Sequence, residues 1–164
     1  MHGMLERNVR DRTILFVGSF GPLGHLPASG TVTVALLGLP LFWMSSRWAP
    51  WIIPAAALIV CALAIWIHHV GDQILNEKDS RKLVWDEIAG FMIAISYLPF
   101  TWKTATVAFV VERIIDITKV PPARRIERTW PGGWGVVGDD VIAGLYTCAI
   151  MHTLVRVVPR WFGV

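Results

Sequence analysis

The sequence predicts an all-α fold, a compact helical membrane bundle of about five apolar helices with short turns and polar cytoplasmic loops. Of its 164 residues, 54% are hydrophobic and 16% are charged, whereas roughly a quarter of the residues of soluble domains are charged. The mean hydropathy is +0.54. Six of the nine tryptophans lie near the ends of apolar runs, as in interfacial aromatic belts. A hydrophobic soluble bundle with tryptophans in its core is the alternative.

A single membrane-embedded domain over residues 1–164 accounts for the length of the chain. Its N-terminal part divides by composition. Residues 1–13 form a polar, basic tail, and residues 14–31 are rich in Gly, Pro and Ser. We expect this second segment to be a loop or a broken helix that lies against the rest of the chain. Residues 32–46 are apolar, with an expected kink at Pro40.

The best candidate for a membrane-spanning helix is the run over residues 51–67. It contains 17 uncharged residues, and a full span takes ~20 residues. His68 and His69 follow directly and are expected to end the helix. A ligand or acid–base role for these two histidines is the functional interpretation.

Three further apolar runs complete the predicted bundle, over residues 88–102, 104–111 and 141–155. Pro99 and Lys103 indicate a short turn between the first two of these runs. The segments that separate the runs, 72–87 and 112–140, are polar and are expected to form loops.

The distribution of Lys and Arg predicts the orientation of the bundle. Eleven of them lie in the tail and in the loops 69–87 and 112–140, against four on the other side. Cytoplasmic loops carry such an excess, so this side and all the acidic pairs are expected to face the cytoplasm. A net charge of +3 is too small to indicate nucleic-acid binding. Membrane lipids are the expected surroundings.

Two acidic pairs lie at the edges of apolar runs. Asp86-Glu87 and Asp139-Asp140 are each followed, after at most one residue, by Ile-Ala-Gly. Carboxylates at a membrane edge stay ionised only with a cation or hydrogen-bond partner. Because several together repel one another, a divalent metal is the expected partner, and oxygen ligands suit Mg²⁺. The alternative is that each pair only stabilises a helix N-terminus.

The spacing of these acids predicts that they converge. Asp86 and Gly90 are four residues apart, as are Asp140 and Gly144. On a helix, each acid would lie one turn from a glycine on the same face. Glycine allows two helices to approach closely, so helices packed at these glycines would bring the acids together.

A third group of charged residues lies in the segment VERIIDITK. Glu112, Asp116 and Lys119 share one helical face at i, i+4 and i+7, next to Arg113. We interpret Asp116 as a metal ligand beside cations that hold phosphate oxygens. A solvated face with ion pairs along the helix is the alternative. The segment GGWGVVG, residues 132–138, is expected to be a flexible turn, whose N–H groups could cradle an anion.

Taken together, four ordered blocks resemble the phosphatidylglycerophosphatase A family over about residues 20–155. The blocks are SGT (29–31), LVWDEIAG (83–90), RIIDITK (113–119) and GGWGVVGDDVIAG (132–144). The resemblance implies Mg²⁺-dependent removal of the terminal phosphate of phosphatidylglycerophosphate, with phosphatidylglycerol and phosphate as products. It also implies a multi-pass protein of the bacterial inner membrane, with its active site on the cytoplasmic side. The oligomeric state stays open.

The same resemblance assigns roles to individual residues. The catalytic and metal-binding positions, for one or two Mg²⁺, are Asp86, Glu87, Asp116, Asp139 and Asp140. The substrate-binding positions are Lys119, Arg113, Arg128, Gly30, Thr31 and Glu127. The general base would be Glu87 or Asp116, and both assignments remain open.

The chain departs from the family pattern at several positions. Ser29 and Val120 replace the usual prolines, Glu112 replaces an aromatic residue, and Glu127 replaces an aspartate. The acids are intact, but a related phospholipid could be the substrate. A membrane ion or solute transporter that uses the acidic cluster is the alternative from another class, and a non-catalytic assembly factor is a third.

Overall fold

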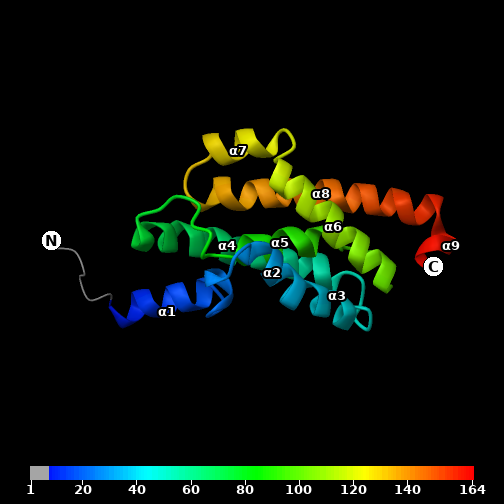
Figure 1. Ribbon diagram of the computed structural model, residues 1–164, viewed down its shortest axis with the longest axis horizontal. Coiled ribbons are helices and arrows are strands. Elements are labelled where there is room, and N and C mark those ends of the chain that lie inside the picture. The colour runs from blue at the N-terminus through cyan, green and yellow to red at the C-terminus, as the bar shows by residue number, and fades with distance from the viewer. Residues whose placement is uncertain (1–7) are drawn as a thin grey trace.

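The computed structural model describes residues 8–164, and these residues form helices with no strand among them, which confirms the all-α prediction. The helices pack around α5 at the centre of an elongated molecule (Figure 1). Their bounds are α1 Val9–Gly18, η1 (a 3₁₀ turn) Leu23–His25, α2 Ser29–Thr33, η2 (a π-helical turn) Val34–Gly38, α3 Leu39–Ser45, α4 Ile52–Leu75, α5 Trp85–Ala94, α6 Trp102–Thr118, α7 Ala123–Thr129, α8 Gly133–Val157 and α9 Pro159–Phe162.

The short helix α5 is the centre of the packing. Seven of its ten residues are buried, and it packs chiefly against α4 and α8. Around its C-terminal half lies the apolar core, where Phe91, Ile95, Phe42 and Met151 are almost fully buried. Phe42 also meets Phe100 edge to face, with ring centroids 5.1 Å apart. The acids at the other end of α5 are therefore anchored to a well-packed scaffold.

Helices α5 and α8 cross at a pair of glycines. A Cβ atom on Gly144 would overlap the carbonyl oxygen of Gly90, and one on Gly90 would lie 2.9 Å from the carbonyl oxygen of Asp140. Only glycine leaves room for two backbones at this separation. The predicted contact at these glycines is confirmed, and it places Asp140 directly against α5.

Several predicted boundaries are wrong. Residues 9–13, expected to belong to the tail, instead begin helix α1, while residues 1–7 lie outside the described part of the chain. Residues 14–31 do form a broken helix, which consists of the end of α1, η1 and the start of α2. Helix α4 does not end at His68 but continues to Leu75, because the first break comes at Asn76, which has a left-handed backbone (φ 52°). Of the polar residues in its last part, His68 and Asp72 lie within ion-pair distance of each other, one helical turn apart.

Helix α6 begins at Trp102, so Lys103 lies in its first turn and not in the predicted turn. The start is set by Thr101, whose side-chain oxygen accepts a hydrogen bond from the Thr104 N–H at 3.0 Å. The segment 112–118, expected at the edge of a loop, is the last part of this helix.

The predicted flexible turn at GGWGVVG is also wrong, because α8 begins at Gly133 and residues 133–138 are helical. These glycines serve packing. A Cβ on Gly133 would overlap the carbonyl oxygen of Ile65, and one on Gly135 would lie 2.9 Å from the carbonyl oxygen of Glu127. The start of α8 is thus pressed against α4 and the end of α7.

Within the described part of the chain, two helices are long and apolar enough to cross a membrane, α4 and α8, with 24 and 25 residues. Less than a third of the most apolar window of each is buried inside the chain. The apolar stretch over residues 29–45 is shorter. The five-helix membrane bundle is therefore not confirmed; the structure supports a helical bundle with two candidate spans.

The α5–α8 crossing gives a test of the packing. Gly144→Leu is expected to lower the free energy of unfolding by about 1–3 kcal/mol, because its side chain must displace α5. Ala149→Leu adds a similar side chain to the exposed side of α8 and serves as the control. Denaturant unfolding of both variants in detergent measures the difference, and equal stability of the two would contradict the close crossing.

Candidate active site

Three helices bring three predicted site acids together. One carboxylate oxygen each of Glu87 (α5), Asp116 (α6) and Asp140 (α8) lies within 4.8 Å of the other two. Glu87 is in the first turn of α5, and Asp116 is in the last turn of α6. Asp140 lies two turns inside α8, on the face that packs against Gly90. The cluster therefore joins segments that are far apart in the sequence.

These acids face a cavity of about 450 Å³. The predicted site residues that line it are Gly30, Thr31, Asp86, Glu87, Arg113, Asp116, Lys119, Asp139 and Asp140. Glu127 does not line the cavity, but it forms an ion pair with Lys119, which does. Arg128 does not line this cavity but a neighbouring hollow. Sequence reasoning missed Asp79 and Arg81 as lining residues, although Asp79 belongs to the acid-rich stretch before α5.

The segment before α2 forms one wall of the cavity. Ala28 has a left-handed backbone (φ 52°), and the Ser29 hydroxyl donates a hydrogen bond to the Arg81 carbonyl at 2.6 Å. A Cβ atom on Gly30 would overlap the Glu87 carboxylate. Gly30 therefore allows Glu87 to reach the cavity, which is a physical reason for glycine at this position.

Arg113 holds the acids of two helices. Its Nε and Nη2 atoms each donate to the Glu112 carboxylate at 2.6 Å. Its Nη1 atom pairs with Glu87 and lies 3.4 Å from Asp116. Glu112 is fully buried, and a buried carboxylate needs such a partner. The departure at Glu112 is thus matched by Arg113, whose guanidinium is already engaged by carboxylates.

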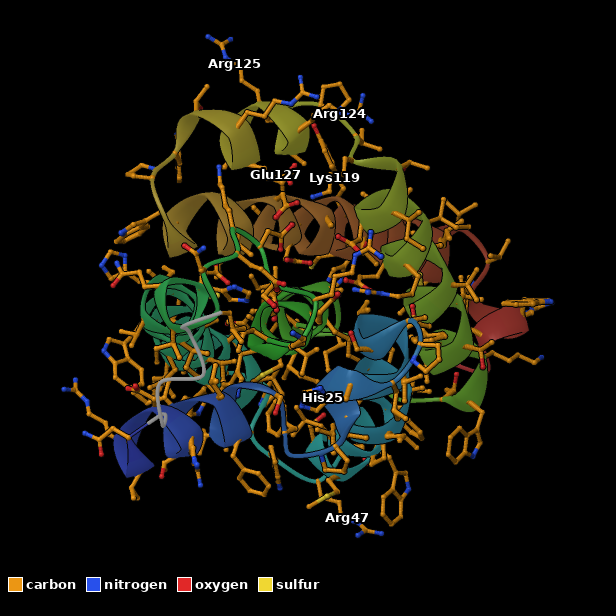
Figure 2. The ribbon with its side chains drawn as sticks, turned by 60° about the vertical axis from the view of Figure 1, so that its left-hand side comes forward. His25, Arg47, Lys119, Arg124, Arg125 and Glu127 are labelled. Atoms are coloured by element: carbon orange, nitrogen blue, oxygen red, sulfur yellow. The ribbon has the colours of Figure 1, made fainter. Side chains whose placement is uncertain are left out.

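Lys119 brings a positive charge to the cavity. It follows the last residue of α6 with a left-handed backbone (φ 49°). Its Nζ atom lies 2.6 Å from Asp139 and 3.0 Å from Glu127, and Figure 2 shows Lys119 and Glu127 side by side between α7 and α8. Burial lowers the pKa of Lys119, but Asp139 and Glu127 outweigh it and raise the pKa. The ammonium therefore stays charged.

His68 lies between Asp86, which lines the cavity, and Asp72, which lies outside it. Its side chain is fully buried, with Nε2 3.2 Å from Asp86 and Nδ1 3.6 Å from Asp72. Asp72 in turn accepts the N–H groups of Asp79 and Ser80, each at 3.1 Å. His68 thus orients Asp86 on the cavity side. The pairing of His68 with Asp72 could have been predicted from the sequence, because the two residues are four apart on one helix.

The five predicted acids therefore have different surroundings. Asp86 contacts His68, and Asp139 contacts Lys119. The other three form the group with converging oxygens. Among them, the Asp140 Oδ1 atom is buried and has no hydrogen-bond partner in the described chain. A buried carboxylate oxygen in this state needs a partner that the chain does not supply, such as an ion or a water molecule.

The donor set fits a hard divalent cation. Three carboxylates converge, and oxygen ligands are those that Mg²⁺ and Ca²⁺ prefer. Burial raises the pKa of Glu87, Arg113 lowers it and the neighbouring acids raise it, and the net result is a pKa of about 8. Without a cation, the negative charges of this site thus oppose one another.

An acid cluster that could hold a metal ion, beside a lysine on a helical scaffold, suits a hydrolase that acts on phosphate esters. Comparison with known proteins identifies the group. The family model of phosphatidylglycerophosphatase A matches residues 16–155, and the chain belongs to this family. The match covers α2–α7 in full and all but the end of α8, and so it includes every helix that supplies an acid to the cavity.

Curated relatives agree with this assignment. The chain is 28% identical to phosphatidylglycerophosphatase A of Escherichia coli (strain K12), over 72% of this chain and 69% of the relative. It is 31% identical to the protein of the same name from Haemophilus influenzae (strain Rd), over 76% and 71%. A putative phosphatidylinositol-3-phosphatase of Bacteroides thetaiotaomicron is 29% identical over 89% of both chains. No solved structure matches significantly.

The raised pKa of Glu87 predicts a pH dependence of the metal-free protein. Between its ordinary pKa of 4.5 and about 8, this carboxyl is protonated in the folded state and ionised in the unfolded state. The folded state then binds more protons, so stability falls as pH rises through this window. Glu87→Gln cannot ionise and is expected to flatten the fall.

The measurement is the thermal midpoint against pH in detergent with a chelator. Glu77→Gln changes an exposed carboxylate outside the cavity and is the control. Wild type and Glu87→Gln with the same pH profile would show that Glu87 is not the group responsible.

Proposed function

We propose that this chain hydrolyses the terminal phosphomonoester of phosphatidylglycerophosphate, with phosphatidylglycerol and phosphate as products. The observation that carries the proposal is the convergence of Glu87, Asp116 and Asp140 on one cavity, beside Lys119. Membership of the phosphatidylglycerophosphatase A family gives the reaction class. The names of two relatives give the substrate.

We propose Mg²⁺ as the cofactor, held by Glu87, Asp116 and Asp140. Bound there, the ion would neutralise phosphate charge and make a water molecule more acidic. The orphaned Asp140 oxygen and the mutual repulsion of the acids support a divalent cation at this position. The choice of Mg²⁺ over other hard cations rests on the family and on its preference for sites shared with phosphate.

Lys119 and Arg113 have separate roles in the proposed site. Lys119 offers its ammonium to the phosphate oxygens, and Asp139 with Glu127 holds it at the cavity. Arg113 keeps Glu87 and Asp116 in position through its guanidinium.

Asp86 is the carboxylate placed to accept a proton from the attacking water. It lines the cavity, lies outside the group of three converging acids and is oriented by His68. This assignment differs from the sequence-based choice of Glu87 or Asp116, because those two acids lie where the cation is expected.

We place the site at the cytoplasmic face of the bacterial inner membrane. The end of α4 and the start of α8 lie together, since Gly133 contacts Ile65. If both helices span the bilayer, the loops that carry most of the Lys and Arg residues share one side, which the charge bias makes cytoplasmic. The lipid tails would then stay in the bilayer while the headgroup enters the cavity.

A related phospholipid is the second candidate substrate. The relative from Bacteroides thetaiotaomicron, named a putative phosphatidylinositol-3-phosphatase, matches over 89% of both chains. Phosphatidylinositol 3-phosphate, like phosphatidylglycerophosphate, carries one phosphodiester and one phosphomonoester. Both lipids therefore belong in the same assay.

The direct test is phosphate release from phosphatidylglycerophosphate in detergent micelles, with Mg²⁺ and then with a chelator. We expect release that requires the metal. Release that is unaffected by the chelator would contradict the metal site. No release from this lipid, from phosphatidylinositol 3-phosphate or from phosphatidate would favour the transport alternative.

Asp140→Asn tests the acid that has no partner. The variant is expected to lose on the order of 100-fold in kcat, because a few kcal/mol of transition-state stabilisation depend on the metal. Its thermal midpoint should stay at or above that of wild type in chelator, since a repelling charge is removed. Asp11→Asn on α1, outside the cavity, is the control. A fully active Asp140→Asn enzyme would exclude Asp140 from the site.

A further inference from the structure

A second hollow adjoins the acidic cavity and has the opposite charge. Its volume is about 480 Å³, and it lies where α6 turns into α7. Four cations and no carboxylate line it. The residues that matter here are Lys119, Pro121, Pro122, Arg124, Arg125 and Arg128. Apart from Lys119, the cations that line the hollow take no part in the proposed hydrolysis, so their charge needs a separate explanation.

The three arginines share one face of α7. Arg124 and Arg128 are four residues apart, and Arg125 lies next to them, so the helical repeat places them together. Glu127 instead faces α8, where it pairs with Lys119 (Figure 2). All three arginines are exposed, and none has an ion pair or side-chain hydrogen bond within residues 8–164. Three like charges on one turn and a half of helix favour an anion between them.

Lys119 connects the two hollows, because it lines both of them. An anion held by the arginines would therefore lie next to whatever occupies the acidic cavity. Arg and Lys are the usual partners of phosphate groups, and the guanidinium fork suits two phosphate oxygens. The pair of hollows suits a molecule with two phosphates close together.

An apolar track leads to the same place. Val110, Ile114 and Ile117 lie on one face of α6 and are 46%, 56% and 71% exposed. Ile117 also lines the acidic cavity. Exposed aliphatic side chains in a row fit acyl chains better than water. The track thus ends at the acidic cavity, close to Lys119, which lines both hollows.

We propose that the basic hollow binds the bridging phosphodiester of the lipid substrate while the phosphomonoester occupies the acidic cavity. This inference rests on the proposed function and extends it to substrate selection. In phosphatidylglycerophosphate one glycerol joins the diester to the monoester, so the two phosphates are close enough to occupy two hollows that share Lys119. Phosphatidate, which has the monoester directly on the diacylglycerol, lacks the recognised group.

The test compares two substrates in one variant. Arg124→Gln, Arg125→Gln and Arg128→Gln are combined, and kcat/KM is measured for phosphatidylglycerophosphate and for phosphatidate in neutral detergent micelles. Charge-assisted hydrogen bonds of this kind are worth enough for about a tenfold change. We expect the ratio of the two kcat/KM values to fall by about tenfold, through a raised KM for the lipid with the diester.

A matched control removes the same charge elsewhere. Arg47, Arg156 and Arg160 are exposed and line neither hollow, and Figure 2 shows Arg47 at the opposite edge of the molecule from Arg124 and Arg125. Their combined change to Gln is expected to leave the ratio as in wild type. Circular dichroism and the thermal midpoint verify that both triple variants are folded.

A second measurement uses the product. Phosphatidylglycerol keeps the diester and lacks the monoester, so we expect it to inhibit wild type about tenfold more strongly than the Arg124/Arg125/Arg128 variant. This inhibition measures binding of the diester alone, because phosphatidylglycerol has no phosphomonoester to react. Equal inhibition of both proteins would overturn the proposal.

The other outcomes are equally decisive. Equal losses on both substrates that grow when anionic lipid is added to the micelle would mean that the arginines attract the membrane surface and do not recognise the diester, which would overturn the proposal. An active wild type with an unchanged ratio in the variant would overturn this inference alone. A wild type that is inactive on phosphatidylglycerophosphate would overturn the proposed function and the inference together.

Discussion

The positions of the acids in the cavity depend on the close approach of α5 and α8 at Gly90 and Gly144. The two backbones nearly touch there, and a side chain at either position would separate the helices. Asp140 lies one turn along α8 from this contact, and Glu87 lies one turn along α5. Asp116 on α6 completes the group of converging oxygens. The close crossing is thus the structural condition for a three-carboxylate site.

Four of the five predicted acids lie within ion-pair distance of a basic side chain, and Asp140 is the exception. Arg113 neutralises the fully buried Glu112 and holds Glu87, and Lys119 pairs with Asp139. Asp140 has no such partner. A cation at this position would remove the imbalance, which links the folding of the site to metal binding.

The same pattern of pairing explains where family departures are tolerated. Glu112 stands where the family has an aromatic residue, and Arg113 engages it through two hydrogen bonds. Glu127 occupies a position where the family has aspartate, and its carboxylate lies 3.0 Å from the Lys119 Nζ atom. Both changes keep the carboxylates that converge on the cavity intact. Lys119 also lines the basic hollow beside α7, so this one lysine contacts both the acidic cavity and the basic hollow.

The sequence by itself determined the helical class, the acids and the glycine contact, because helical periodicity and the Asp-to-Gly spacing are local properties. It did not determine the ends of α4 and α6 or the helical state of residues 133–138. Those depend on side-chain partners and on backbones that come from distant segments. Only the tertiary structure could separate Glu87, Asp116 and Asp140 from Asp86 and Asp139, because the distinction lies in distances between helices that the chain order does not encode.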